Sequence, residues 1–470
     1  MIMDSSIINL FEVNIFKSKS TLLLEGGFRL NADYYSHDNH FCLPNKIPTS
    51  KLSDLAKVIG FGPFKRYYID DLKYGIPLIS SSEMMELNPT YEGIISKEFT
   101  KDIDKYIVFR NTILVSCSGT IGNVTIVDSR LEGMALSQHS LRVIPKNIEV
   151  TGLIYTFLSS VYGKSLISGK KSGAVIDEIY EDDLNGIDVP ILPQKYILEI
   201  NKLIFQAYSN RDIANDLLKK SQALVLKYNN LPLLDRIEKE TLDPENGVDI
   251  RLVNTSEFTD EYRIDAHFYN PIADLAVKNI KSASKGYQNL FEVADCTFRG
   301  GRSIRNYVGK EHGTPFLSGK NIIQIRPDLK YISNTETGNL NEMLVEKNWI
   351  LITRSGTLGR TVFVWKNYEG FAASEHLIRV VPFENSIDQG YLYAFLSSDY
   401  GYHQLLRYKH GSVIYEITED QISKALIPLP NNNYQKEIGN IVRQAYDLRA
   451  EAIRLEDKAQ ETLTQALTTA

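Results

Sequence analysis

A long amphipathic segment that occurs twice is the feature that most constrains this chain. Residues 195–228 contain no proline or glycine, and their apolar and small residues recur three, four and seven positions apart. This spacing places them on one stripe of a single long helix. Residues 434–466 repeat the pattern, and Gln206-Ala207-Tyr208 matches Gln444-Ala445-Tyr446 at an offset of 446 − 208 = 238.

The stripe is narrow and includes small side chains, which suits close packing against one other helix. We therefore predict that the two segments form an antiparallel pair within the chain. Asn215 and Lys219 are predicted on the opposite, polar face. The stripe of the first segment consists of Ile200, Leu203, Ile204, Ala207, Ala214, Leu217, Leu218, Ser221, Leu224 and Val225.

The remainder of the chain is duplicated in the same order. Six further segments recur with an offset that drifts only from 234 to 238 residues. Ordered repetition over this length predicts two units with the same plan. The matching pairs are 28–35 with 262–269, 75–80 with 313–318, 118–122 with 355–359, 137–143 with 374–380, 155–160 with 393–398, and 189–193 with 427–430.

We predict an α+β fold with two tandem, internally duplicated mixed α/β domains, separated and joined by the two antiparallel helices as a coiled-coil pair. Each domain combines short strands rich in β-branched residues with a helix, at 151–166 in the first and 389–406 in the second. Pro232 and the dense charge around it indicate an exposed linker. The predicted boundaries are 1–194 for the first domain, 195–230 for its helix, 231–260 for the linker, 261–432 for the second domain and 433–470 for its helix.

Composition and charge exclude several classes of protein. The net charge of −6 argues against a histone-like binder, although it is compatible with local basic patches. Cys42, Cys117 and Cys296 are far apart, which predicts no disulfide framework and a reducing compartment, so we expect a cytoplasmic protein. The first ten residues have neither the basic nor the apolar region of a signal peptide, so we expect none, and no run approaches about 20 apolar residues.

Sequence signatures of catalysis are absent. The chain has no GxxxxGK[ST] phosphate loop, no GxGxxG after a strand, and no Cys/His cluster with zinc spacing. The segment 88–91, Asn-Pro-Thr-Tyr, lacks the second proline of the adenine methyltransferase motif, and no glycine-rich cofactor loop accompanies it. We interpret it as a turn.

Two Ser-Gly-Thr segments, at 118–120 and 355–357, favour a hairpin turn over a nucleophile. His139 and His376 recur at matching positions, but neither half supplies a carboxylate or thiol in matching register. We therefore expect each histidine to be a core or turn residue that donates to a backbone carbonyl.

Basic, glycine-containing loops with aromatic neighbours recur in both halves and suit a polyanion. They lie at 61–68 and 298–307, and again at 169–173 and 407–412. Their framework residues match while their loop residues differ, which is typical of two domains that read different targets. The residues predicted to contact DNA are Lys65, Arg66, Tyr67, Ser118, Thr120, Lys170, Lys171, Arg299, Arg302, Ser303, Arg305, Lys320, Arg354, Ser355, Thr357, Lys409 and Ser412.

With these features the chain resembles the specificity subunits of type I restriction–modification systems over nearly its whole length. The resemblance rests on the order of the elements, in which each domain is followed by a long helix, and on three motifs. Residues 263–269, Arg-Ile-Asp-Ala-His-Phe-Tyr, match the family's Arg-x-Asp-Ala-x-x-Tyr pattern. The corresponding segment in the first half of this chain has Asn31 in place of the aspartate. Both Ser-Gly-Thr-x-Gly turns are present, and so is the glycine-serine loop that leads into a proline-rich helix start at 411–430. The family's Pro-Pro-Leu-x-Glu-Gln element is degenerate before both long helices.

The resemblance implies a non-catalytic subunit that reads a bipartite, asymmetric site in double-stranded DNA. It implies two adenine methyltransferase subunits and restriction/translocase subunits as partners, with S-adenosylmethionine and ATP bound by them and no cofactor bound by this chain. The helices would act as spacer and docking platform. About 34 helical residues span roughly 50 Å, enough to separate two readers by one turn of DNA, about 34–36 Å.

Two other functions remain open from the sequence. A recognition part of a fused restriction–methylation enzyme is disfavoured by the missing methyltransferase motifs. A duplicated coiled-coil adaptor that binds protein would not need the basic, aromatic loops.

Overall fold

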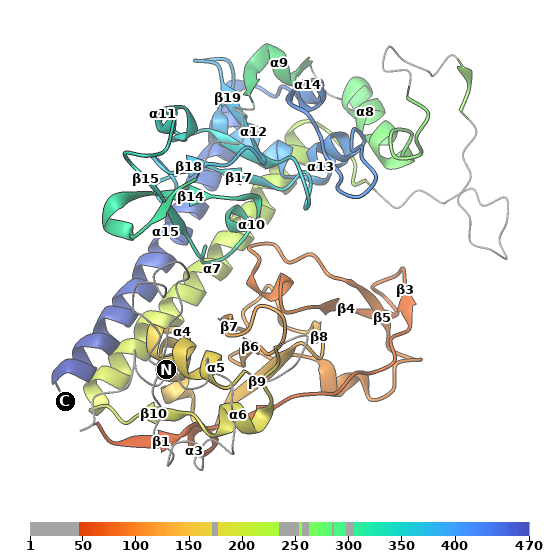
Figure 1. Ribbon diagram of the computed structural model, residues 1–470. Coiled ribbons are helices and arrows are strands. Elements are labelled where there is room, and N and C mark those ends of the chain that lie inside the picture. The colour runs from red at the N-terminus through yellow and green to blue at the C-terminus, as the bar shows by residue number, and fades with distance from the viewer. Residues whose placement is uncertain are drawn as a thin grey trace, which may run out of the picture. The chain divides into compact units, whose positions relative to one another are not determined.

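The computed structural model describes residues 47–171, 177–234, 253–255, 263–283, 286–297 and 305–469. The chain divides into two compact units, and each unit includes part of both long helices (Figure 1). Unit 1 comprises Met1–Tyr208 with Arg454–Ala470, and unit 2 comprises Ser209–Ile453. Most of the predicted linker 231–260 lies outside the described residues.

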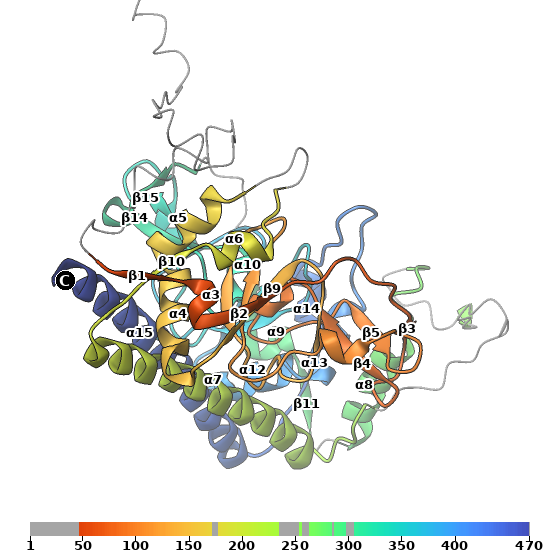
Figure 2. The same cartoon turned by 90° about the horizontal axis from the view of Figure 1, so that it is seen from below.

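The two long helices are present, as α7 (Gln194–Tyr228) and α15 (Asn432–Thr469). Within unit 2 they run antiparallel and lie side by side (Figures 1 and 2). The rings of Tyr228 and Tyr434 stack with centroids 3.9 Å apart, and Arg449 Nη2 donates to Asn215 Oδ1 at 3.0 Å. All ten residues of the predicted stripe are buried or half-buried.

One prediction about the helix faces is wrong. Asn215 was expected on the polar face, but it is buried, and so is Arg449. Burying an amide or a guanidinium is costly unless it is hydrogen-bonded, and these two side chains bond each other. A polar pair in an apolar seam favours one register over its alternatives, because a shifted helix would leave both groups unpaired.

The described residues of unit 1 form two four-stranded sheets and a two-stranded ribbon. The strand orders are β2-β9-β6-β7, β3-β5-β4-β8 and β1-β10. All pairs are antiparallel except β4 with β8. The strands are β1 (Thr49–Lys51), β2 (Ala56–Ile59), β3 (Tyr68–Ile69), β4 (Gly75–Ile79), β5 (Gly93–Ser96), β6 (Ile113–Ser116), β7 (Val124–Ile126), β8 (Ala135–Leu136), β9 (Ser140–Pro145) and β10 (Asp188–Pro190).

Unit 2 repeats this topology strand for strand. Its orders are β12-β19-β16-β17, β13-β15-β14-β18 and β11-β20, again with one parallel pair, β14 with β18. The duplication seen in the sequence is therefore a duplication of fold. The strands are β11 (Tyr287–Asn289), β12 (Ala294–Thr297), β13 (Tyr307–Val308), β14 (Gly313–Leu317), β15 (Lys330–Ser333), β16 (Ile350–Thr353), β17 (Thr361–Phe363), β18 (Ala372–Ala373), β19 (Leu377–Pro382) and β20 (Leu426–Pro428).

The helices of the globular parts are short. Unit 1 contains α3 (Leu52–Leu55), η3 (Glu83–Met85), η4 (Ile103–Tyr106), η5 (Ile148–Val150), α4 (Thr151–Ser159), α5 (Val161–Gly169) and α6 (Glu181–Asn185). Unit 2 contains α8 (Pro271–Ala283), α9 (Leu290–Val293), η7 (Lys310–His312), α10 (Gly319–Ile322), α11 (Leu340–Met343), α12 (Gln389–Leu396), α13 (Asp399–Leu406) and α14 (Glu419–Ser423).

Each helix predicted after the main sheet is in fact two helices. Ser160 is extended and separates α4 from α5, and its hydroxyl accepts from Gly163 N at 3.1 Å. Ser398 caps α13 in the same way through Gly401 N. A serine N-cap ends one helix and starts the next because its side chain replaces the missing intrahelical acceptor. The apolar periodicity does not reveal such a break.

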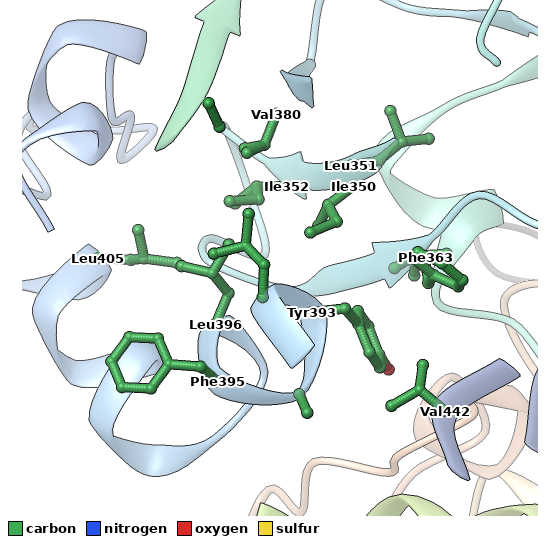
Figure 3. Packing of buried hydrophobic residues seen from close by; sticks show 14 of the residues in the cluster. Ile350, Leu351, Ile352, Phe363, Val380, Tyr393, Phe395, Leu396, Leu405 and Val442 are labelled. Carbon is green, nitrogen blue, oxygen red and sulfur yellow. The ribbon is translucent and has the colours of Figure 1, made fainter. Parts of the chain in front are cut away.

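A tyrosine from each long helix binds the edge strand of the main sheet. Tyr208 of α7 accepts from Ile126 N on β7 at 3.1 Å, and Tyr446 of α15 accepts from Phe363 N on β17 at 3.0 Å. All four residues are buried. In unit 2 the tyrosine lies in the core formed by β16, β17, β19, α12 and α15, part of which is seen from close by in Figure 3. The repeated Gln-Ala-Tyr motif therefore joins each sheet to a helix.

The other long helix supplies a second, equivalent contact in each unit. In unit 1, Gln460 Nε2 of α15 donates to Thr156 O at 2.9 Å and to Ser159 Oγ at 3.0 Å. In unit 2, Gln222 Nε2 of α7 donates to Ser397 O at 2.8 Å. The bond from a glutamine of the long helix to a serine hydroxyl thus recurs at the offset of 238 residues, Gln460 to Ser159 and Gln222 to Ser397, with the roles of α7 and α15 exchanged.

The hydroxyl of Tyr446 is expected to contribute measurably to the stability of unit 2. Tyr446→Phe leaves the buried Phe363 N–H without an acceptor, which costs roughly 1–3 kcal/mol. Urea-induced unfolding of the full chain measures this loss. Tyr434→Phe is the control, because that half-exposed ring keeps its stacking on Tyr228 and should change stability by less than about 0.5 kcal/mol. Equal effects of the two variants would contradict this role.

Candidate nucleic-acid interface

A glycine turn follows the central strand of each main sheet, at 118–122 in unit 1 and 355–359 in unit 2. Gly119 and Gly122 have φ of +68° and +86°, and Gly356 and Gly359 have +70° and +72°. These left-handed conformations favour glycine. The first turn connects β6 to β7 and the second connects β16 to β17, so the predicted hairpin turn is confirmed.

A side chain at the end of each central strand closes the turn. Ser116 Oγ donates to Thr120 O at 2.6 Å and accepts from Asn123 N at 2.9 Å. In unit 2, Thr353 Oγ1 donates to Thr357 O and accepts from Arg360 N at 2.9 Å. The closed turn leaves Thr120 and Thr357 exposed.

A serine–histidine pair lies at the base of each turn. Ser118 Oγ and His139 Nδ1 are 2.6 Å apart, and Ser355 Oγ and His376 Nδ1 are 2.7 Å apart. The prediction that each histidine ring donates to a backbone carbonyl is therefore wrong. The main-chain carbonyl of His139 accepts a separate hydrogen bond from Cys117 N at 3.0 Å.

An arginine from the preceding basic loop joins each pair through the residue before the histidine. In unit 1, Arg66 Nη2 donates to Gln138 Oε1 at 2.5 Å, and Gln138 Nε2 lies 3.0 Å from His139 Nε2. Arg66 also pairs with Glu92 at 2.6 Å. Two of the predicted DNA-binding residues, Arg66 and Ser118, are thus brought into one hydrogen-bonded network.

Unit 2 has the same network with a carboxylate in place of the amide. Arg305 Nη2 donates to Glu375, and Glu375 Oε1 lies 3.7 Å from His376 Nε2. At the position before the histidine, unit 2 has a carboxylate and unit 1 has an amide, so this carboxylate does not recur in matching register. The carboxylate is already paired with Arg305, and unit 1 keeps the geometry with a neutral amide. The network therefore holds the turn in both units without needing a charged triad.

In each half, a residue that follows the second basic loop pairs with the glycine turn. Glu178 forms an isolated antiparallel bridge with Ser118, and Glu416 forms one with Ser355. Next to these bridges, Lys171 Nζ lies 3.8 Å from Asp177 Oδ2, and Arg354 Nη2 lies 3.5 Å from Glu416 Oε2. Segments far apart in sequence therefore converge on one surface in each unit.

The family-like motif at 263–269 fixes the base of the second basic loop in unit 2. Arg263 donates from Nη1 to Tyr408 O at 2.9 Å and from Nη2 to Lys409 O at 2.8 Å. Asp265 Oδ2 accepts from Arg263 Nε at 2.7 Å and orients the guanidinium. Tyr269 Oη donates to Arg263 O at 2.8 Å. The motif therefore positions the second basic loop, a role that the sequence pattern alone does not indicate.

Positive charge in this region lies over aromatic rings. Lys409 Nζ is 4.7 Å from the ring centroid of Tyr415, and Lys65 Nζ is 4.8 Å from that of Tyr67. Burial and the charge of Lys409 lower the pKa of His267, whose ring meets Tyr415 edge to face. An ammonium held over a ring keeps its charge and remains available to a phosphate.

The other predicted residues have varied positions. Lys170 follows α5, Lys320 lies exposed on α10, and Ser412 is exposed in the second basic loop. Arg299, Arg302 and Ser303 lie outside the described residues. Sequence reasoning did not select Gln138 and Glu375. The signal that could have found them is the repeat of Ser-Gln-His as Ser-Glu-His at 137–139 and 374–376.

Comparison with known proteins decides the family. The family described as "Type I restriction modification DNA specificity domain" matches residues 44–227 and 289–463, one match in each half. The chain belongs to this family. Type I specificity domains therefore account for both units, and the sequence-based assignment to specificity subunits and to two tandem mixed α/β domains is confirmed.

Solved structures similar to this specificity chain come from the same systems. One is the S subunit of a type I restriction–modification system from M. genitalium, with 14% identity and a TM-score of 0.32, covering 91% of this chain and 96% of that one. Another is the HsdS subunit from Thermoanaerobacter tengcongensis, with 15% identity and a TM-score of 0.28, covering 92% and 98%. No curated protein matches the chain. Scores this low transfer no structural detail, so the family match alone carries the assignment.

None of the chain's described helices is long and apolar enough to cross a bilayer. Over the described residues, His, Cys, Asp and Glu form no group of three or more that could hold a metal ion.

Glu375→Gln should change how the stability of unit 2 depends on pH, because it supplies the amide that unit 1 has. Burial opposes ionisation of Glu375, but a backbone hydrogen bond and the charge of Arg305 lower its pKa below the ordinary 4.5. A carboxylate with a lowered pKa stabilises the fold above its unfolded pKa, and this contribution disappears as the pH falls through the folded value.

We therefore expect wild type to lose stability relative to Glu375→Gln between about pH 5 and about pH 3. Urea unfolding across that range gives the difference. Glu384→Gln removes an exposed carboxylate and serves as the control. A wild-type-minus-variant difference that stays constant with pH would show that Arg305 does not stabilise the ionised carboxylate.

Proposed function

We propose that this chain is the DNA-reading subunit of a type I restriction–modification complex and that each unit reads one half of a bipartite, asymmetric site. The observation that carries the proposal is the repeated interface. Both units hold the same Ser-Gly-Thr-x-Gly turn in the same framework, whereas the sequences of the basic loops at 61–68 and 298–307 differ. A shared frame with different exposed groups is what two readers of different base sequences require.

The chemistry of the exposed groups suits duplex DNA. The hydroxyls of Thr120 and Thr357 protrude from rigid turns and can bond base edges or phosphates. Lys65 and Lys409 carry charge that a phosphate would neutralise. Arg66, Arg305 and Arg354 already bond side chains of the protein, so their proposed role is to hold the turn and to add positive potential.

The partners follow from the family. We propose that two adenine methyltransferase subunits dock on the chain, together with restriction/translocase subunits. S-adenosylmethionine and ATP would be bound by those subunits, and this chain would be non-catalytic. Long helices that belong to both units offer equivalent surfaces for two identical partners, because each unit presents the same contacts with α7 and α15 exchanged.

Loop substitutions in one unit should affect one half-site only. Thr357→Ala with Lys409→Ala should weaken discrimination in the half read by unit 2, and Thr120→Ala with Lys65→Ala should do so in the other half. Each lost base contact costs about 1–3 kcal/mol of discrimination, and each lost phosphate contact lowers the salt slope by about 1. The measurement is affinity of the reconstituted methyltransferase complex for duplexes carrying the methylated site.

The two double variants serve as controls for each other. The proposal fails if the wild-type complex prefers no split sequence, or if a variant in one unit alters both half-sites equally.

A further inference from the structure

A hairpin at 410–416, which overlaps the end of the second basic loop of unit 2, has an apolar, exposed tip. Val413 is 93% exposed and Ile414 is 62% exposed, between Ser412 on one side and the partly exposed Tyr415 on the other. Leaving two adjacent aliphatic side chains in water is unfavourable unless something covers them in use. The tip therefore differs from the single exposed apolar residues found on any protein surface.

A short hairpin holds this tip rigidly at its base. His410 N donates to Glu416 O at 3.0 Å, and Glu416 N donates to His410 O at 2.8 Å. Gly411 has φ of +113°, and a Cβ at that position would lie 2.3 Å from Ile414 O, so the turn requires glycine. The hairpin conformation is thus built into the fold.

Both ends of the hairpin are attached to the proposed DNA surface. Arg263 bonds the carbonyl of Lys409 at one end. At the other end Ile417 N donates to Arg354 O at 3.0 Å, next to the bridge between Ser355 and Glu416. When unit 2 contacts DNA through its glycine turn, Val413 and Ile414 would therefore lie against the same duplex.

We propose that Val413 and Ile414 form a wedge that enters a groove of the duplex and unstacks one base-pair step within or beside the half-site read by unit 2. Apolar side chains that insert between base steps are a known means of kinking DNA. Burial of two aliphatic side chains is comparable with the cost of unstacking one step. This inference rests on the proposed DNA-reading function.

Duplex DNA fits this tip better than a protein partner does. Two aliphatic side chains offer far less than the roughly 800 Å² that each partner buries in a stable protein interface. Lys409 stands at the base of the hairpin and favours a polyanion. The same Gly-x-Val-Ile sequence also recurs in the first half, at 173–176 and 411–414, although the structure does not describe 173–176.

The test uses the full chain assembled with its methyltransferase subunits and duplexes that carry 2-aminopurine at each adenine position in turn. Wild type should raise the fluorescence several-fold at one step near the second half-site, and Val413→Ser with Ile414→Ser should abolish that rise. We expect the affinity of the variant to fall on the order of tenfold. Ile148→Ser, an exposed isoleucine on η5, is the matched control and should change neither quantity.

A mismatch at the responsive step gives a second readout. It lowers the cost of unstacking, so wild type should bind the mismatched duplex more tightly than the matched one, whereas the variant should gain nothing. A target adenine flipped by a methyltransferase subunit would give a signal at its own position in both proteins, and this signal is independent of the wedge.

Three outcomes would overturn the wedge. The first is a variant with wild-type affinity and fluorescence. The second is a loss of affinity without a position-specific rise in wild type, which would indicate contact to base edges alone. The third is loss of methyltransferase subunits from the purified variant complex, which would place the tip in a protein interface. A wild-type complex without any sequence preference would instead refute the proposed function.

Discussion

The bond between a helix tyrosine and the edge strand of a sheet is the interaction on which each unit depends. Edge strands expose backbone donors, and a buried donor without a partner is costly. Tyr208 and Tyr446 remove that cost for Ile126 N and Phe363 N while their rings fill the space between sheet and helix. The strand that binds the tyrosine, β7 or β17, follows directly after the glycine turn. The position of the helix therefore also sets the position of the turn.

The two units use one frame for different chemistry. Arginine, a polar side chain, histidine and serine form the same network below both glycine turns, but unit 1 has the neutral Gln138 where unit 2 has the anionic Glu375. The network fixes the geometry of the turn, and the exposed residues around it are free to differ. A rigid frame with variable exposed groups separates stability from specificity, which is the division that a DNA-specificity subunit needs.

Much of this architecture could be predicted from the sequence because it is periodic. The stripes of α7 and α15 and the duplicated strands leave regular patterns. Features that depend on a single side chain in a particular place could not be predicted. Examples are the buried pair of Asn215 and Arg449, the break at Ser160, and the bond between Ser118 and His139. Arg263 belongs to a motif visible in the sequence, but its hydrogen bonds to the carbonyls of Tyr408 and Lys409 depend on how the chain folds.

Under the proposed function, two independent readers are joined by helices whose length sets the spacing of their half-sites. In unit 2, Asn215 pairs with Arg449 and Tyr228 with Tyr434, which puts Ile453 opposite Asn210. Inserting seven residues after each of Asn210 and Ile453 lengthens both helices by about 10 Å, roughly three base pairs. Sequencing of methylated adenines in cells that express this variant should show both half-sites unchanged and a longer unread spacer. An unchanged spacer, or an altered half-site, would contradict the account.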